Sequence, residues 1–117
     1  MTLQECYAAM GGNYDDAIGR LRSERLVQKF VLKFLSDGSY ELLCRSLEEK
    51  NYEEAFRAAH TLKGVTQNLS FTRLYQSSHE ITEALRTKDY DLALQLLPKV
   101  EGDYTRTAEA IQAYQGG

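Results

Sequence analysis

Apolar residues recur three and four positions apart along almost the whole chain, and this spacing constrains the fold more than any other feature. Each stripe predicts a helix with one buried face. Five stripes follow one another, over residues 26–35, 42–47, 55–69, 74–85 and 93–111. The single proline, Pro98, falls inside the last stripe, where we expect a kink or a break in the helix.

The stripes are separated by only a few residues, so consecutive helices should lie antiparallel and side by side. At 117 residues the chain is long enough for one buried core and too short for two. We therefore expect residues 1–117 to form a single all-α domain. The bundle, an up-down antiparallel four-helix bundle, should cover residues 21 to 114, with short additional helices in residues 1–20.

Similar short segments begin at Asn13, Asn51 and Asp89, at a constant spacing. An Asn or Asp side chain can accept hydrogen bonds from the free amides of a first helical turn, and acidic residues in that turn complement the helix dipole. The residues between the copies do not match, so we interpret them as one kind of helix cap used three times and not as a repeat array.

Charge and composition exclude several classes of protein. The formal net charge is −3, and the basic residues are scattered among acids, which argues against a nucleic-acid-binding protein. No apolar run approaches the roughly 20 residues that cross a bilayer, and no secretory signal is visible. Cys6 and Cys44 lack metal-ligand spacing, so we expect reduced thiols. The expected protein is soluble, cytoplasmic and, with no long heptad seam, monomeric.

His60 is the candidate functional residue. On a helical wheel of residues 51–70 it falls about 140° from Ala55, whereas the apolar positions cluster within roughly 80° of the core direction. His60 should therefore face solvent and not the core. His79, the other histidine, also lies off the apolar stripe of its segment, and we interpret it as a solvated side chain.

The residues that follow His60 on the same helical face distinguish it from an idle surface histidine. Lys63 and Gly64 lie three and four positions on, and Gln67 lies two turns on. A glycine inside an exposed helix costs about 1 kcal/mol relative to alanine. Its presence makes sense where another molecule must approach the backbone closely, so we interpret this face as a docking surface.

Two phenylalanines add apolar area to the predicted docking surface. Phe56 lies one turn before His60, and Phe71 would point the same way if the helix continued that far. Exposed aromatic side chains around a functional residue are typical of protein–protein contacts.

The chemistry of these residues suits phosphoryl transfer. An unperturbed imidazole is mostly neutral at pH 7, and its ring nitrogen can attack phosphorus to form a phosphoramidate. Lys63 supplies positive charge for the phosphoryl oxygens, and Gln67 a hydrogen-bond donor for the phosphoryl group or the imidazole. Positioning and electrostatic stabilisation account for most of the catalysis in such a transfer, and a partner can bring the metal and the carboxylates.

The run Ala58-Ala-His-Thr-Leu-Lys-Gly64 resembles the active-site helix of histidine phosphotransfer (Hpt) domains, whose pattern is His-x-Leu-Lys-Gly. Helix lengths and apolar spacing extend the resemblance over residues 21–114. Two positions depart from the family's pattern: Gln67 is bulkier than the small residues usual there, and Ser70 replaces a glycine. We expect Ser70 to cap the following helix.

The resemblance implies that His60 is phosphorylated and that Lys63 and Gly64 support it. It further implies a carrier without kinase or ATP-binding activity in a multistep phosphorelay of two-component signal transduction. The implied partners are receiver domains of hybrid histidine kinases and response regulators. The chain needs no cofactor of its own, because the expected magnesium ion belongs to the receiver.

Three other functions remain to be weighed against this one. An adaptor of the same helical fold would bind receivers without carrying phosphate, and it would not need His60. A metal site built on His60 and His79 would require further ligands for which the sequence shows no spacing. An acid–base enzyme would need paired carboxylates on one face, and Glu53 and Glu54 are explained by the dipole of their helix.

Overall fold

Capping residues set where most of the helices begin. In the computed structural model, which describes residues 1–117, Asn13, Asn51 and Asp89 each accept a hydrogen bond from a backbone amide of the first turn that follows. The shared cap predicted for these three positions is therefore confirmed. The helices are α1 (Leu3–Met10), α2 (Tyr14–Leu21), α3 (Glu24–Phe34), α4 (Ser39–Glu48), α5 (Tyr52–Asn68), α6 (Thr72–Arg86) and α7 (Tyr90–Gly116).

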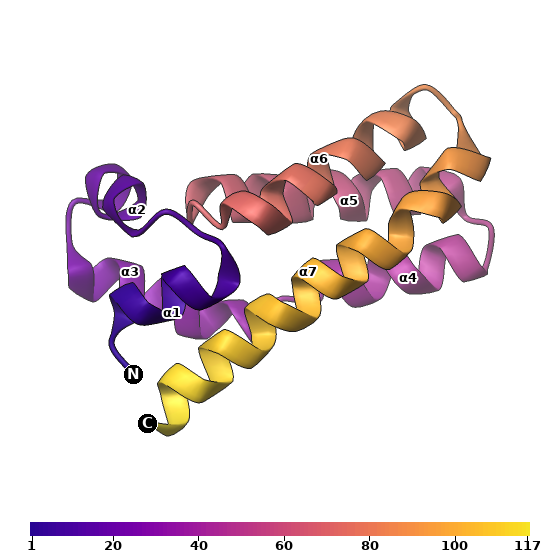
Figure 1. Cartoon of the computed structure of the whole chain (residues 1–117). Helices are drawn as coiled ribbons and strands as arrows, with labels where there is room; N and C mark the ends of the chain where they lie inside the picture. Colours follow the sequence, from indigo (N-terminus) through magenta and orange to yellow (C-terminus); the bar gives the residue numbers. More distant parts are fainter.

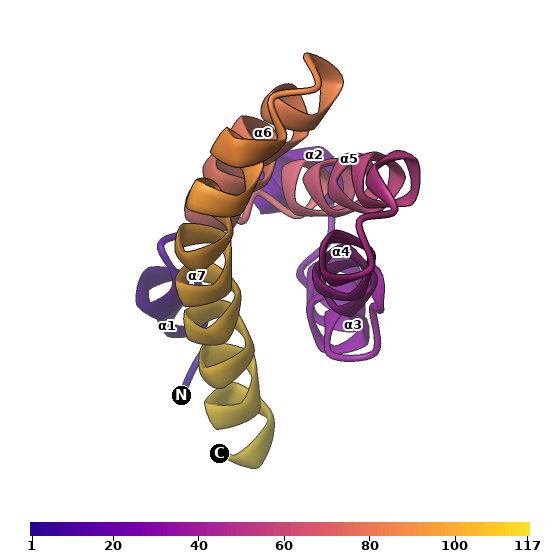
Figure 2. The same ribbon diagram turned by 90° about the vertical axis from the view of Figure 1, so that its right-hand side faces the viewer.

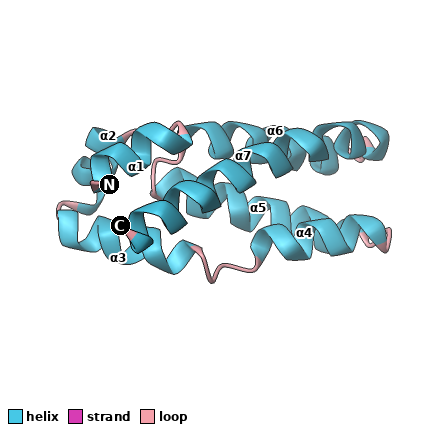
Figure 3. Ribbon diagram, turned by 60° about the horizontal axis from the view of Figure 1, so that its bottom comes forward, coloured by secondary structure: helices cyan, strands magenta, loops and turns pink.

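The predicted all-α bundle is confirmed. Helix α5 packs between α4 and α6, and α6 packs between α5 and α7, so α5 and α7 lie diagonally across the bundle (Figures 1 and 2). Helices α3 and α4 follow one another along the same side and are joined by residues 35–38 (Figure 3). The short helices α1 and α2 cover the end of the bundle at which α5 turns into α6 (Figure 1).

The core lies where the apolar stripes meet. Helix α5 contributes mainly small residues, which let its neighbours approach closely: Ala55, Ala58, Ala59, Leu62 and Thr66 are buried. Aromatic side chains fill the end of the bundle beside α1, where the fully buried Tyr7 and Phe71 lie edge to face with ring centroids 5.6 Å apart. Both cysteines are free thiols, as expected, and Cys6 is fully buried.

Helix α7 runs through Pro98 without interruption, so the break considered at that position does not occur. Pro98 lies in the interior of the helix, where it lacks the amide of one helical hydrogen bond, and its side chain faces solvent. None of the helices is both long and apolar enough to span a membrane.

Candidate functional site

His60 lies on the solvent-facing side of α5. The helix buries Ala59 and Leu62, the neighbours of His60 on the core side, and leaves the imidazole exposed, as the helical wheel predicts. No ion pair or side-chain hydrogen bond within the chain involves the imidazole, so its ring nitrogens are accessible to an incoming molecule.

Gly64 leaves a bare stretch of backbone one turn from His60. A Cβ atom built at this position would meet nothing within 4 Å, so packing within the chain does not require a glycine there. Its backbone is helical and not left-handed, so conformation does not require one either. Gly64 leaves the backbone beside His60 accessible to another molecule, which agrees with the docking interpretation. Lys63, half-buried beside it, makes no ion pair.

Phe56 borders His60 on the other side, one turn toward the start of α5. The centroids of its ring and the imidazole are 5.9 Å apart. The guanidinium carbon of Arg86, on α6, lies 5.1 Å from the same phenyl centroid and forms a cation–π contact. Phe56 is half-buried, so one part of the ring packs on the core and the remainder belongs to the surface around His60.

Helix α6 forms a second wall along this face. Phe56 meets Arg86 at one end of the two helices, and Gln67 lines a cavity with Tyr75 at the other end. Because the helices are antiparallel, the positions between these two contacts also pair, and Lys63 lies opposite His79. Glu83 lies one turn further along α6 than His79, close enough to both groups to be affected by their charges. The hydrogen bond from Arg86, and then the charges of Arg86, His79 and Lys63, lower the pKa of its carboxyl.

His79 is half-buried and is not the freely solvated side chain that we expected. Its ring stacks on Tyr75 with centroids 6.0 Å apart, and its Nδ1 atom is buried without a hydrogen-bond partner. The chain contains no group of three His, Cys, Asp or Glu side chains arranged to hold a metal ion. A metal centre built on His60 and His79 therefore has no support.

Gln67 is exposed at the far end of the face. It lines a cavity of about 200 Å³ together with Ser70 and Tyr75, and with Asp16 and Arg20 of α2. Two helical turns, or about 10 Å along the axis, separate Gln67 from His60.

The family of the chain is identified by comparison with known families. Residues 33–115, more than half of the chain, match the family model described as the Hpt domain. The chain belongs to the Hpt domain family. The matched range contains α4, α5 and α6 entirely, α7 except for its last residue, and the last two residues of α3, and it leaves out α1 and α2. No curated protein and no solved structure matches the chain.

Membership of the Hpt family shows the general function. Hpt domains are phosphoryl carriers of phosphorelays that interact with receiver domains, and they are not kinases. The face built around His60 is the one that carries the family's His-x-Leu-Lys-Gly pattern in this chain.

Phe71 does not belong to the surface around His60 in this Hpt domain, and its prediction as a partner-binding residue is wrong. It is only 1% exposed, and its ring lies 5.2 Å from that of Phe34, centroid to centroid. The physical reason is that α5 ends at Asn68. The chain then reverses, so Phe71 precedes α6 and points into the core and not along the face of α5.

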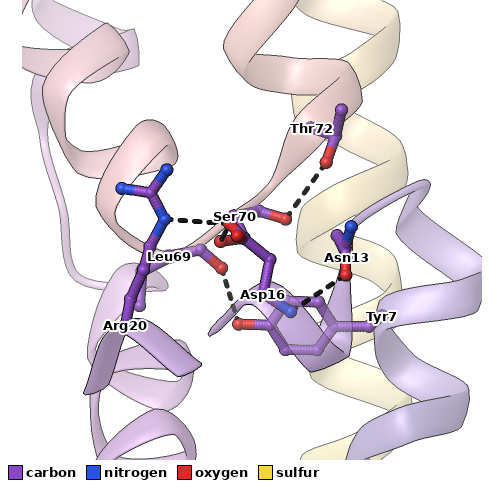
Figure 4. A network of polar contacts seen from close by, with 7 residues as sticks. All are labelled: Tyr7, Asn13, Asp16, Arg20, Leu69, Ser70 and Thr72. Carbon is purple, nitrogen blue, oxygen red and sulfur yellow. Dashed lines mark hydrogen bonds and ion pairs between the residues drawn. The ribbon is translucent and has the colours of Figure 1, made fainter. Parts of the chain in front are cut away.

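Ser70 makes this reversal, and it does not cap α6 as expected. Its φ is 58°, in the left-handed region that favours glycine. This backbone conformation explains why the family pattern has a glycine at this position. The Ser70 hydroxyl donates a hydrogen bond to Asp16, which also accepts one from Arg20 (Figure 4). The Ser70 carbonyl accepts a hydrogen bond from the amide of Asn13.

The residues of α2 and α6 that border the His60 face were not predicted from the sequence. Tyr75, His79, Glu83 and Arg86 recur at helical spacing, which identifies them as one side of α6. Nothing in that spacing says that this side borders His60. Arg20 and Asp16 are separated from Gln67 by about 50 residues of sequence, and only the folded chain brings them to the same cavity.

Proposed function

We propose that this Hpt domain accepts a phosphoryl group on His60 from the aspartate of one receiver and passes it to the aspartate of another. The observation that carries the proposal is the exposed, unpaired imidazole beside a bare helical backbone at Gly64 and an unpaired ammonium group at Lys63. In the cytoplasm of a cell, such a carrier connects a hybrid histidine kinase to a response regulator.

The transfer step follows from these groups. The lone pair of a ring nitrogen of His60 forms a bond to phosphorus while the bond from phosphorus to the receiver aspartate breaks, and the electron pair of that bond stays on the carboxylate. The second transfer reverses these events on another receiver. The magnesium ion bound by the receiver, together with Lys63, offsets the negative charge on the phosphoryl oxygens.

The surrounding residues hold the two proteins in place. Gly64 lets the receiver approach the backbone of α5, and Phe56, held by Arg86, offers apolar area beside the reacting atoms. Gln67 lies about 10 Å from His60 along the helix, a longer separation than a glutamine side chain spans. We therefore assign Gln67 to contact with the receiver and not to a hydrogen bond with the imidazole.

A transfer assay tests the proposal. A receiver carrying radiolabelled phosphate is incubated with the chain and magnesium, and the label on the chain is tested for the acid lability and alkali stability of a phosphoramidate. Wild type and His79→Gln should take up label, and His60→Gln should take up none. Label on the His60→Gln variant would contradict the proposal, because the phosphoryl group would then reside elsewhere.

The same variants separate loss of chemistry from loss of structure. Because His60 is exposed, His60→Gln should change the free energy of unfolding by no more than about 0.5 kcal/mol. A receiver should also still bind this variant. Binding of receivers to a wild-type chain that never takes up label would favour the phosphate-independent adaptor.

A further inference from the structure

Helix α2 lies at the edge of the face that carries His60, although it is remote in sequence. Arg20 and Asp16 of α2 line the same cavity as Gln67 and Tyr75. Gln67 and His60 project from one side of α5, the side toward α6. On the other flank of His60, toward α4, Arg57 and Thr61 line a different cavity. Helix α2 therefore extends the flank of the His60 face that borders α6, beyond Gln67.

The size of protein interfaces places α2 within reach of any protein that docks on His60. A stable complex of standard size buries about 800 Å² on each partner, which corresponds to a disc of roughly 16 Å radius. Gln67 lies about 10 Å from His60 along α5. Arg20, which shares a cavity with Gln67, falls at the rim of such a disc centred on His60.

Helix α2 is held firmly in this position. The loop before it is tied to the turn between α5 and α6 by backbone hydrogen bonds from Asn13 N to Ser70 O, 2.9 Å, and from Arg73 N to Gly11 O, 3.2 Å. The Ser70 hydroxyl donates to Asp16 (Figure 4). A surface that is already ordered loses little conformational entropy when a partner binds to it.

Arg20 has donors to spare. Its Nε atom donates to Asp16 at 2.8 Å, and its two terminal nitrogens make no hydrogen bond within the chain and point away from Ser70 (Figure 4). Arg86 is paired in the same way with Glu83, at 2.9 Å, whereas Lys63 makes no ion pair. The phosphorylated aspartate site of a receiver is anionic, so it is complementary to the ammonium group of Lys63 and to the free guanidinium nitrogens of Arg20.

We propose that α2 is a second element of the receiver-docking surface, and that Arg20 is a residue by which this chain distinguishes one receiver from another. This proposal rests on the function proposed above. Helix α2 lies outside residues 33–115, the range matched by the family, so the contact belongs to this chain and does not follow from family membership. Arg20 recognises an acidic or phosphoryl-bearing surface at the rim of the receiver site.

Binding measurements on charge variants test the proposal. The His60→Gln background keeps docking and removes transfer, and the probe is a receiver that labels the wild-type chain, saturated with magnesium and beryllofluoride as a phosphoryl mimic. Arg20→Glu should weaken binding of the receiver about tenfold and Arg20→Ala about threefold, and the affinities of the two variants should converge at high salt. Arg20→Lys should retain most of the affinity. For a second receiver, the same substitutions should reduce the affinity by a different factor.

Arg106→Glu is the matched control. Arg106 is an exposed arginine of α7, diagonally across the bundle from α5, and it makes no ion pair. This variant should bind as the background does. Arg20→Ala and Arg20→Lys should unfold at nearly the same denaturant concentration as the background, because an exposed pair such as Arg20–Asp16 contributes little stability. Arg20→Glu places a second negative charge one turn from Asp16 and should lower that concentration slightly.

The possible outcomes separate the two proposals. Equal dissociation constants for Arg20→Glu and Arg106→Glu, with a wild-type chain that takes up label, would overturn the role of α2 and leave the carrier function intact. If Arg20→Glu reduced the affinity for every receiver by the same factor, α2 would remain part of the interface, but its role in distinguishing one receiver from another would be overturned. A wild-type chain that no receiver labels would overturn both.

Discussion

Gly64, beside His60, has a close structural counterpart in Gly102. Both are exposed glycines inside long helices, and a Cβ atom at either position would meet nothing within 4 Å. They differ in position. Gly64 lies on α5 beside His60, and Gly102 lies on α7, diagonally across the bundle.

This pair gives a prediction at the residue scale. Gly64→Ala and Gly102→Ala should each raise the free energy of unfolding by about 0.5–1 kcal/mol, because alanine favours the helix and fits without a clash. Only the change at Gly64 should slow phosphoryl transfer from a receiver, and Gly64→Leu should slow it further. Denaturant unfolding and the transfer assay measure the two effects. Equal transfer rates for all of these variants would remove the close-approach explanation of Gly64.

At the scale of elements, the turn between α5 and α6 and the loop between α1 and α2 form one unit. Tyr7 of α1 donates its hydroxyl to Leu69 O at 2.8 Å in a buried position, and Asp16 of α2 accepts from Ser70 (Figure 4). The hydrogen bond from Ser70, and then that from Arg20, lower the pKa of the Asp16 carboxyl. The position of the far end of the His60 face therefore depends on two helices outside the matched family range.

The lowered pKa of Asp16 predicts how this contact depends on pH. A carboxyl whose pKa is lower in the folded than in the unfolded chain stabilises the fold above its unfolded pKa, about 3.9, and loses that effect as the pH falls through its folded pKa. Asp16→Asn should therefore be less stable than wild type at pH 7, and the difference should shrink below about pH 4. Urea unfolding at a series of pH values measures it.

Asp15→Asn is the control for the loss of charge in the first turn of α2. Asp15 is exposed and makes neither an ion pair nor a side-chain hydrogen bond. Its replacement should cost less stability at pH 7 than that of Asp16. If the two replacements have the same effect at every pH, the contact between Asp16 and Ser70 does not contribute.

At the scale of the whole molecule, the N-terminal helices complete the core. The buried side chains before residue 33 are Leu3, Cys6, Tyr7, Met10, Ala17, Val27 and Val31. Tyr7 packs on Phe71, which in turn packs on Phe34. The core of this chain is thus larger than the core of the range that matches the family.

A truncated chain tests this dependence. Each fully buried large side chain contributes about 1.5–3 kcal/mol, and a domain of this size is stable by only about 5–15 kcal/mol. Residues 33–117 alone should therefore lose the cooperative thermal transition seen by circular dichroism and should bind a hydrophobic dye. Residues 1–114, which lack only exposed C-terminal residues, should melt as the full chain does. A cooperative transition in the 33–117 fragment would show that the N-terminal helices are dispensable for the core.

Short-range sequence patterns were enough to predict much of the secondary structure of this protein. Apolar spacing predicted the helices, and the Asn and Asp caps predicted where three of them begin, because both effects act within one or two turns of the chain. The exposure of His60 followed from the same periodicity, since a residue well away from the buried stripe of a helix must face outward. The unbroken path of α7 through Pro98 did not follow, because tertiary packing outweighs the local cost of a proline.

Tertiary structure alone decided which elements surround His60. Phe71 is buried because the chain reverses at Ser70, and a helical wheel extended past that residue places Phe71 on the wrong side. Arg86, Glu83 and His79 line the face because α6 presents one particular side to α5. Arg20 reaches the same face through contacts between segments about 50 residues apart. Patterns in the sequence predicted the helices and the exposure of His60. The surroundings of that histidine depend on contacts distant in the chain, which no local pattern encodes.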